Sequence, residues 1–172
     1  MSVETNSIFV IIALGLGASF GMDIWNLFLK RVFKIPSLNY CLLGRWLCFF
    51  PEGIFIHANI TTAQQKPYEC AIGWFAHYSI GVVFSYVFVF LKSGDWLESP
   101  TLLPALLYGI ATVVFPLFIM QPALGFGIAS SKTPNPTKAR LKSIATHTVF
   151  GVCMYLCAIG INYFLRFLNL NW

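Results

Sequence analysis

The sequence predicts an all-α membrane protein with four transmembrane helices. Of its 172 residues, 58% are hydrophobic and only 10% are charged, whereas a soluble domain carries about 25% charged residues. The mean hydropathy is +0.73. Four segments are also at least as long as the roughly 20 residues that a helix needs to cross a bilayer. We therefore expect one transmembrane domain over residues 1–172, with no separate soluble module.

The first predicted span covers residues 7–29, and Lys30 and Arg31 follow it at once. A cleavable signal peptide has the opposite order of charge, so we expect this helix to be retained with its N-terminus outside. Asp23 and Asn26 lie on one polar face of the helix. A carboxylate at this depth is unusual, which makes that face a candidate for function.

Residues 30–69 form a basic loop that contains an apolar run at 37–50. The run carries Arg45 and ends at Pro51, so it is too short and too charged to cross the membrane. This pattern predicts an interfacial helix in the first cytoplasmic loop. A fifth span is the alternative, but it would place the basic residues of this loop on opposite sides of the membrane.

The second and fourth predicted spans, residues 70–91 and 136–168, each carry one histidine. His77 and His147 lie on stripes of residues spaced by four. Small residues on such a stripe let a neighbouring helix approach, and the histidine then faces that helix rather than lipid. Asn135, followed by proline, predicts the N-cap of the fourth helix.

The third predicted span covers residues 101–128 and is interrupted by Pro116 and Pro122 on either side of Gln121. Prolines free backbone carbonyls, which inside a membrane must find partners or line a polar cavity. We therefore expect a kink near Gln121. The short loop before this span contains Trp96, which we expect to act as an anchor at the membrane interface.

The distribution of positive charge predicts the orientation. Of the 11 Lys and Arg residues, all but Lys92 and Arg166 lie in the loops at 30–69 and 129–142. The positive-inside rule then places both loops in the cytoplasm and both termini in the periplasm of a bacterial inner membrane. The net charge of +5 thus reflects topology and membrane lipid. We expect no nucleic-acid partner, because no basic helix is interleaved with aromatic residues.

The five cysteines form no CxxC pair, and we interpret them as small hydrophobic residues in a reduced or lipid-shielded setting. Cys153 and Cys157 share one face of the fourth span. Gly17 and Gly21 in the first span have GxxxG spacing, which predicts a seat for a neighbouring helix.

The two halves of the chain resemble each other, which predicts a parallel internal repeat of two helical hairpins. Asp23 and Gln121 each lie thirteen residues before a proline, and His77 and His147 each begin the pattern H-x-x-x-G-V. The first and third spans run in the same direction, so the repeat axis would be normal to the membrane.

The repeat collects scattered polar residues into one expected cluster inside the membrane. Ionisable groups there cost several kcal/mol unless they find partners, so they are functional candidates by default. The expected ligand-binding cluster consists of Asp23, Asn26, His77, Tyr78, Gln121, Arg140 and His147.

This cluster permits three functions. The leading interpretation is a small permease- or channel-like protein that binds a cation, a proton or a small polar solute. Such a protein would be a homo-oligomer, because four helices enclose little room. The first alternative is a haem or transition-metal site using His77 and His147, with Asp23 as a further metal ligand. The second is a structural subunit that partners another membrane protein, in which these residues only join helices. An enzyme is not favoured, since neither a DxxD pair nor a Ser/His/Asp set is present.

Several segments of the chain resemble one known family. They are GMDIW (21–25), IPSLNY (35–40), GRW (44–46), GWFAHY (73–78), PTLLPALLYG (100–109), MQPALGFGIASSKTPNP (120–136) and ARLKSIATHTVFG (139–151). Together they are similar to the uncharacterised bacterial inner-membrane family called domain of unknown function 2938, over roughly residues 10–160. The resemblance implies a four-span inner-membrane protein of unassigned activity, and it supplies no catalytic residue.

Overall fold

The computed structural model describes residues 3–36, 39–92 and 95–168, with side chains from residue 8 onward. All regular elements in these ranges are helical. Four of the described helical segments are long and apolar enough to cross a membrane, which confirms the predicted all-α class. They are α1 (Val3–Val32), α3 (Glu69–Leu91), the broken segment Leu102–Ala123, and α7 (Pro136–Phe167).

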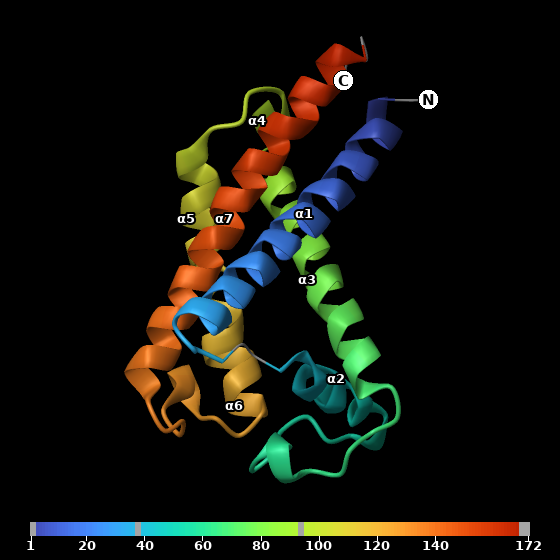
Figure 1. The fold of residues 1–172 in the computed structure, drawn as a ribbon. Helices are drawn as coiled ribbons and strands as arrows, with labels where there is room; N and C mark the ends of the chain where they lie inside the picture. Colours follow the sequence, from blue (N-terminus) through green and yellow to red (C-terminus); the bar gives the residue numbers. More distant parts are fainter. Residues whose placement is uncertain (1–2, 37–38, 93–94, 169–172) are drawn as a thin grey trace.

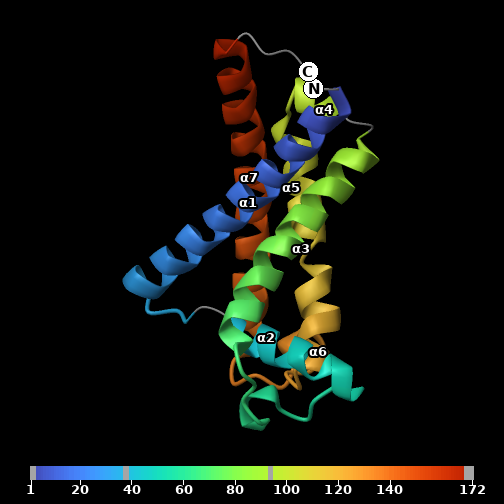
Figure 2. The ribbon, with the colours of Figure 1, turned by 90° about the vertical axis from the view of Figure 1, so that its right-hand side faces the viewer.

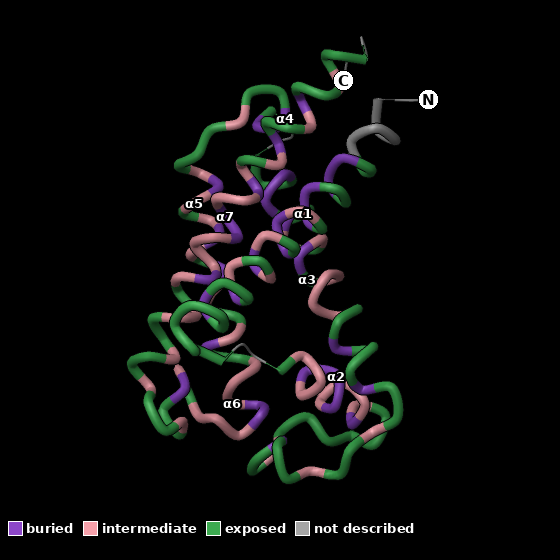
Figure 3. Tube along the Cα trace, viewed as in Figure 1, coloured by how far each residue is buried: buried purple, intermediate pink, exposed green. Residues whose placement is uncertain are grey.

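The four long segments alternate in direction, and α1 crosses the others diagonally (Figures 1 and 2). The start of α1 and the end of α7 lie at one end of the molecule. The helices α2 (Tyr40–Cys48) and α6 (Gln121–Ala123) lie at the other, which we call the loop end. Buried residues concentrate where the helices meet (Figure 3). Between 22% and 39% of each apolar window is buried, so most of the apolar surface faces outward, as expected for contact with lipid.

Two glycines set the crossing of α1 and α3. A Cβ atom on Gly15 would lie 2.5 Å from the Cα atom of Val82, and one on Gly81 would lie 3.1 Å from the carbonyl oxygen of Gly15. A side chain at either position would push the helices apart, so the crossing depends on small residues. Asp23 lies two turns after Gly15 and His77 one turn before Gly81, so this crossing brings both side chains to the loop side.

The GxxxG pair of the first span also seats a helix, as predicted. Gly17 and Gly21 face the side chains of Cys157 and Cys153 on α7. These cysteines are free thiols, and they pack as small hydrophobic residues against the other side of α1.

The third span is irregular, but its break begins earlier than expected. The helix α5 (Leu102–Ala111) ends before Thr112, and a π-helical turn, Phe115–Met120, continues the segment. Pro116 lacks an N–H, so the regular bonding pattern fails one turn before the predicted kink at Gln121. The span ends at Ala123 and not at residue 128, because the chain reverses there through two glycines with positive φ, Gly125 and Gly127.

The fourth helix begins as the sequence predicts. The side chain of Asn135 accepts a hydrogen bond from the backbone N–H of Lys138, and Pro136 occupies the first helical position. Asn135 therefore satisfies one of the free N–H groups at this helix start, which confirms the predicted N-cap.

The first loop folds around a buried ion pair. Arg45 on α2 donates to both carboxylate oxygens of Glu69, at 2.8 and 2.7 Å, and to the carbonyl oxygens of Ile60 and Ala63, each at 3.1 Å. The guanidinium thereby organises the chain between α2 and α3. The predicted helix at 37–50 is thus confirmed as a helix, over Tyr40–Cys48.

The structure corrects the interpretation of two cysteines. Cys41 and Cys70 form a disulfide between the starts of α2 and α3. These starts lie side by side because Gly44 and Gly73 let the two backbones touch; a Cβ on Gly73 would lie 2.7 Å from the carbonyl carbon of Tyr40. Cys41 and Cys70 are therefore not reduced hydrophobic residues.

Trp96 is also placed differently from the prediction. Its side chain is 5% exposed, packs edge-on against Phe88 at 4.7 Å between ring centroids, and donates to the carbonyl oxygen of Thr101 at 3.0 Å. The short helix α4 (Asp95–Glu98) turns the indole inward. Trp96 therefore belongs to the core and does not anchor the chain at the membrane interface.

Candidate functional site

The carboxylate of Asp23 is the centre of a polar site between α1, α2 and α3. Tyr78 donates its hydroxyl hydrogen to Oδ2 at 2.9 Å, and Tyr40 donates to Oδ1 at 3.1 Å. Nε2 of His77 lies 3.2 Å from Oδ1. The side chains of Asp23 and His77 are 17% and 11% exposed. We call these four residues the Asp23 site.

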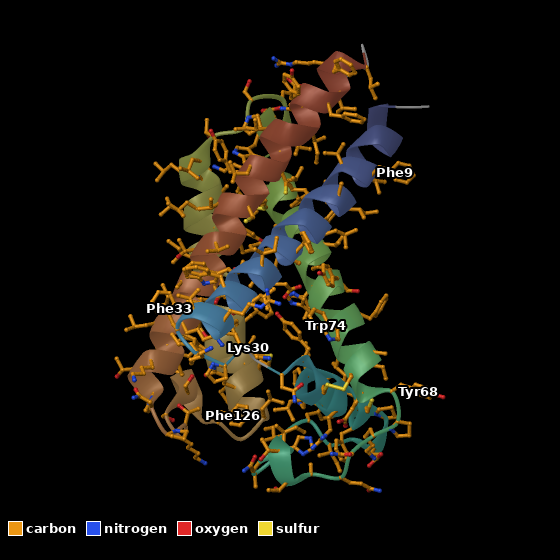
Figure 4. All side chains as sticks on the ribbon, viewed as in Figure 1. Phe9, Lys30, Phe33, Tyr68, Trp74 and Phe126 are labelled. Carbon is orange, nitrogen blue, oxygen red and sulfur yellow. A yellow bond between two sulfur atoms is a disulfide. The ribbon has the colours of Figure 1, made fainter. Side chains whose placement is uncertain are left out.

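Aromatic rings cover the site toward the loop end. The ring of Tyr40 stacks on the imidazole of His77 with 4.2 Å between centroids, and Trp74 meets Tyr40 edge-on at 4.7 Å. Trp74 lies on the lower part of α3 (Figure 4). Burial, and then the carboxylate of Asp23, raises the pKa of Tyr40 above its usual value. Its phenol therefore stays protonated and remains a hydrogen-bond donor at ordinary pH.

His147 on α7 is held by Thr112, the residue that directly follows α5. Its Nδ1 is 2.8 Å from the hydroxyl oxygen of Thr112, which itself donates to the carbonyl oxygen of Gly109 at 2.6 Å. The threonine hydrogen is thus used, so Nδ1–H of His147 donates and Nε2 is left as an acceptor.

The structure brings together only part of the expected cluster. Gln121 accepts a hydrogen bond from Ser130, and Nε of Arg140 donates to the carbonyl oxygen of Ala129 at 2.7 Å, both at the loop end. Asn26 is 8% exposed, one turn after Asp23. Tyr78 and His77 both contact Asp23, whereas His147 bonds to Thr112, and Gln121 and Arg140 bond at the loop end.

Sequence reasoning missed three contributors to the site, Tyr40, Trp74 and Thr112. Tyr40 enters only because α2 docks on α3, and the one hint of that docking was the presence of small residues, Gly44 and Gly73. Thr112 enters because α5 ends beside His147. Contacts of this kind depend on tertiary packing, which periodicity within one segment does not report.

The Asp23 site offers one carboxylate and one imidazole as ionisable groups. Within the part of the chain that the structure describes, no three His, Cys, Asp or Glu side chains form a group able to hold a metal. Nε2 of His77, a ring nitrogen that could bind iron, lies 3.2 Å from Oδ1 of Asp23 and therefore faces a carboxylate. A carboxylate beside an imidazole can instead bind one proton between them.

The chain was also compared with known proteins. The model of the family described as "Protein of unknown function (DUF2938)" matches residues 12–161. This range contains all four members of the Asp23 site and His147. No curated protein and no solved structure matches the chain.

Proposed function

The chain belongs to the DUF2938 family of proteins of unknown function, and we propose that it is a small permease-like membrane protein whose Asp23 site binds and releases protons. The observation that carries the proposal is the 3.2 Å separation between Oδ1 of Asp23 and Nε2 of His77, on two helices able to cross a membrane. Paired ionisable groups at such depth typically mark ion or proton pathways.

A proton fits this site because it needs no cavity. Three donors or partners surround the carboxylate within 3.2 Å, which leaves little space there for a solute. A shared proton changes the charge of the pair, which lies between α1 and α3. We infer that protonation of the pair drives the movement of a small solute or ion by a neighbouring path.

The proposal is tested by proton flux into vesicles that contain the purified protein and a pH-sensitive dye. Asp23→Asn keeps the size of the side chain and removes its charge, so we expect flux to fall to that of empty vesicles. Asp95→Asn, which changes an exposed carboxylate at the opposite end, is the matched control and should leave flux unchanged. Equal flux in the wild type and the Asp23 variant would refute proton binding as the function.

A structural role is the second candidate, since the same contacts join α1, α2 and α3. It predicts that Asp23→Asn lowers stability while the wild type carries no flux. A haem or metal site, the other alternative, is tested by an optical spectrum and elemental analysis of the same preparation. Loss of a cofactor from both His77→Ala and His147→Ala would favour that alternative over proton binding.

We further propose a location in the bacterial inner membrane with both termini in the periplasm. The clustering of basic residues in the loops supports this orientation. The Cys41–Cys70 disulfide lies at the same end, and disulfides are rare in a reducing cytoplasm. The disulfide therefore favours the opposite orientation, with the loop end in the periplasm, and the charge distribution favours the proposed one. Reporter fusions to either terminus test the placement.

We also propose that the protein forms a homo-oligomer. A homo-oligomer would supply the path that four helices alone do not enclose, and a partner membrane protein is the alternative. An interfacial position of α2 is supported by its length of 9 residues. A parallel repeat is supported by the shared direction of α1 and α5, although His77 contacts Asp23 whereas His147 contacts Thr112.

A further inference from the structure

We propose that the basic end of α1 binds the headgroup of an anionic phospholipid. Lys30, Arg31 and Lys34 line a hollow of about 550 Å³ together with Leu27 and Pro36. This volume lies within the range of small-molecule sites. Three cations around one hollow attract the negative charge of a phosphodiester, and basic pockets at the ends of membrane helices recognise such headgroups.

The positive charge of this hollow is not neutralised within the described chain. Glu52 pairs with Lys66, Glu69 pairs with Arg45, and Asp23 is held in its own site. The carboxylates of α4 lie at the opposite end of the molecule. No described carboxylate forms an ion pair with any of the three cations that line the hollow.

The backbone holds the cations around the hollow. After α1 the chain turns back, with Lys34 in the left-handed region at φ 57° and the N–H of Ile35 donating to the carbonyl oxygen of Leu29 at 3.2 Å. That region is unfavourable for any residue with a side chain, so the surrounding structure must hold it. Lys142 of α7 does so by donating to the carbonyl oxygen of Pro36.

Exposed aromatic rings at the same end of α1 favour a lipid over a soluble anion. Phe28 lies between Trp25 and Phe33, with centroid separations of 5.6 and 5.7 Å. Phe28 and Phe33 are 44% and 59% exposed, and this end of α1 projects away from the other helices in Figure 2. Acyl chains can lie along these rings while the phosphate meets Lys30, an arrangement typical of a membrane interface.

The test is titration of the detergent-purified protein with phosphatidylglycerol, followed by native mass spectrometry. We expect saturable binding that phosphatidylcholine does not reproduce. The Arg31→Gln/Lys34→Gln variant should bind phosphatidylglycerol about 30-fold more weakly, because each cation contributes roughly a fivefold gain in affinity. A matched variant, Lys132→Gln/Lys138→Gln, removes two exposed cations at the same end and should retain wild-type affinity.

Two results would overturn the proposal. Equal weakening in both double variants would show that only the overall charge of the loop end matters. Binding of inorganic phosphate with the affinity of phosphatidylglycerol would show a site for a soluble anion. Circular dichroism of each variant confirms that the fold is retained, and the control variant has the same change in net charge.

Discussion

Nε2 of His77 lies 3.2 Å from Oδ1 of Asp23, so an imidazole on α3 and a carboxylate on α1 meet on the loop side of the helix crossing. The two groups come from the two helices that the small residues Gly15 and Gly81 bring into backbone contact. The position of the pair is therefore set by the crossing, and its chemistry is set by the aromatic residues around it.

Loss of the Tyr40 hydroxyl should weaken the site. Tyr40→Phe removes one of two phenol donors to the Asp23 carboxylate, and we expect a loss of about 1.5–3 kcal/mol in the free energy of unfolding, as for a hydrogen bond to a charged group. Thermal unfolding in detergent measures it. Tyr86→Phe on the exposed side of α3 is the control, expected to change stability by about 0.5 kcal/mol or less. Equal effects of the two variants would contradict the assigned contact.

The buried ion pair should be far more sensitive than an exposed one. Glu69→Gln leaves the guanidinium of Arg45 buried without its charge partner, and we expect destabilisation of about 3–5 kcal/mol. An arginine guanidinium keeps its proton at any ordinary pH, so the buried positive charge persists in the variant. Glu52→Gln, in the exposed pair with Lys66, should cost about 1 kcal/mol or less.

The effect of Glu69→Gln should be local. Because Arg45 also binds the carbonyls of Ile60 and Ala63, hydrogen exchange should increase first between α2 and α3. Uniform loss of protection along the whole chain would show that this loop does not fold around Arg45.

The helix crossing should tolerate no side chain. Gly15→Val places methyl groups against the backbone of α3 at Val82, and we expect destabilisation of at least about 1–3 kcal/mol together with loss of the Asp23 contacts. Gly160→Val on α7 is the control, because a Cβ atom there meets nothing within 4 Å. Melting temperatures in detergent compare the two, and equal shifts would argue against the close approach.

The disulfide should stabilise the docking of α2 on α3. It closes a sequence separation of 29 residues, so Cys41→Ser should lower the free energy of unfolding by about 3–4 kcal/mol in oxidised protein. Cys153→Ser, which changes a free thiol, should have a smaller effect. A thiol-alkylation shift on gels of intact cells reports the state of the pair. Full oxidation of the pair in intact cells would instead indicate that the loop end lies in the periplasm.

The long elements were predictable because lipid imposes one simple rule on each. An apolar run of sufficient length must form a helix, so α1, α3 and α7 appear within a few residues of their expected bounds. The end of the third span was not predictable in this way. Pro116 and Gly125 act on backbone bonding one residue at a time, and their effect depends on what packs beside them.

Within the site, the residues found from the sequence were those whose burial in lipid is itself unfavourable. Asp23 and His77 stand out in apolar segments, whereas Tyr40 lies in a loop where a tyrosine is ordinary. The equivalence drawn between Asp23 and Gln121 did not extend to contacts, because the third span breaks before Gln121 and turns that side chain toward Ser130. Similar spacing along the chain does not ensure similar surroundings.

Gly15 is the point at which α1 is held against α3, so a tilt of α1 moves each residue in proportion to its distance from Gly15. With a rise of about 1.5 Å per residue, Asp23 lies roughly 12 Å from the crossing and Lys30 roughly 22 Å. Any rocking of α1 about Gly15 therefore displaces Lys30 nearly twice as far as Asp23. A small displacement of the Lys30 end of the helix would thus change the distance between Asp23 and His77, so membrane composition and thickness have a mechanical route to the Asp23 site.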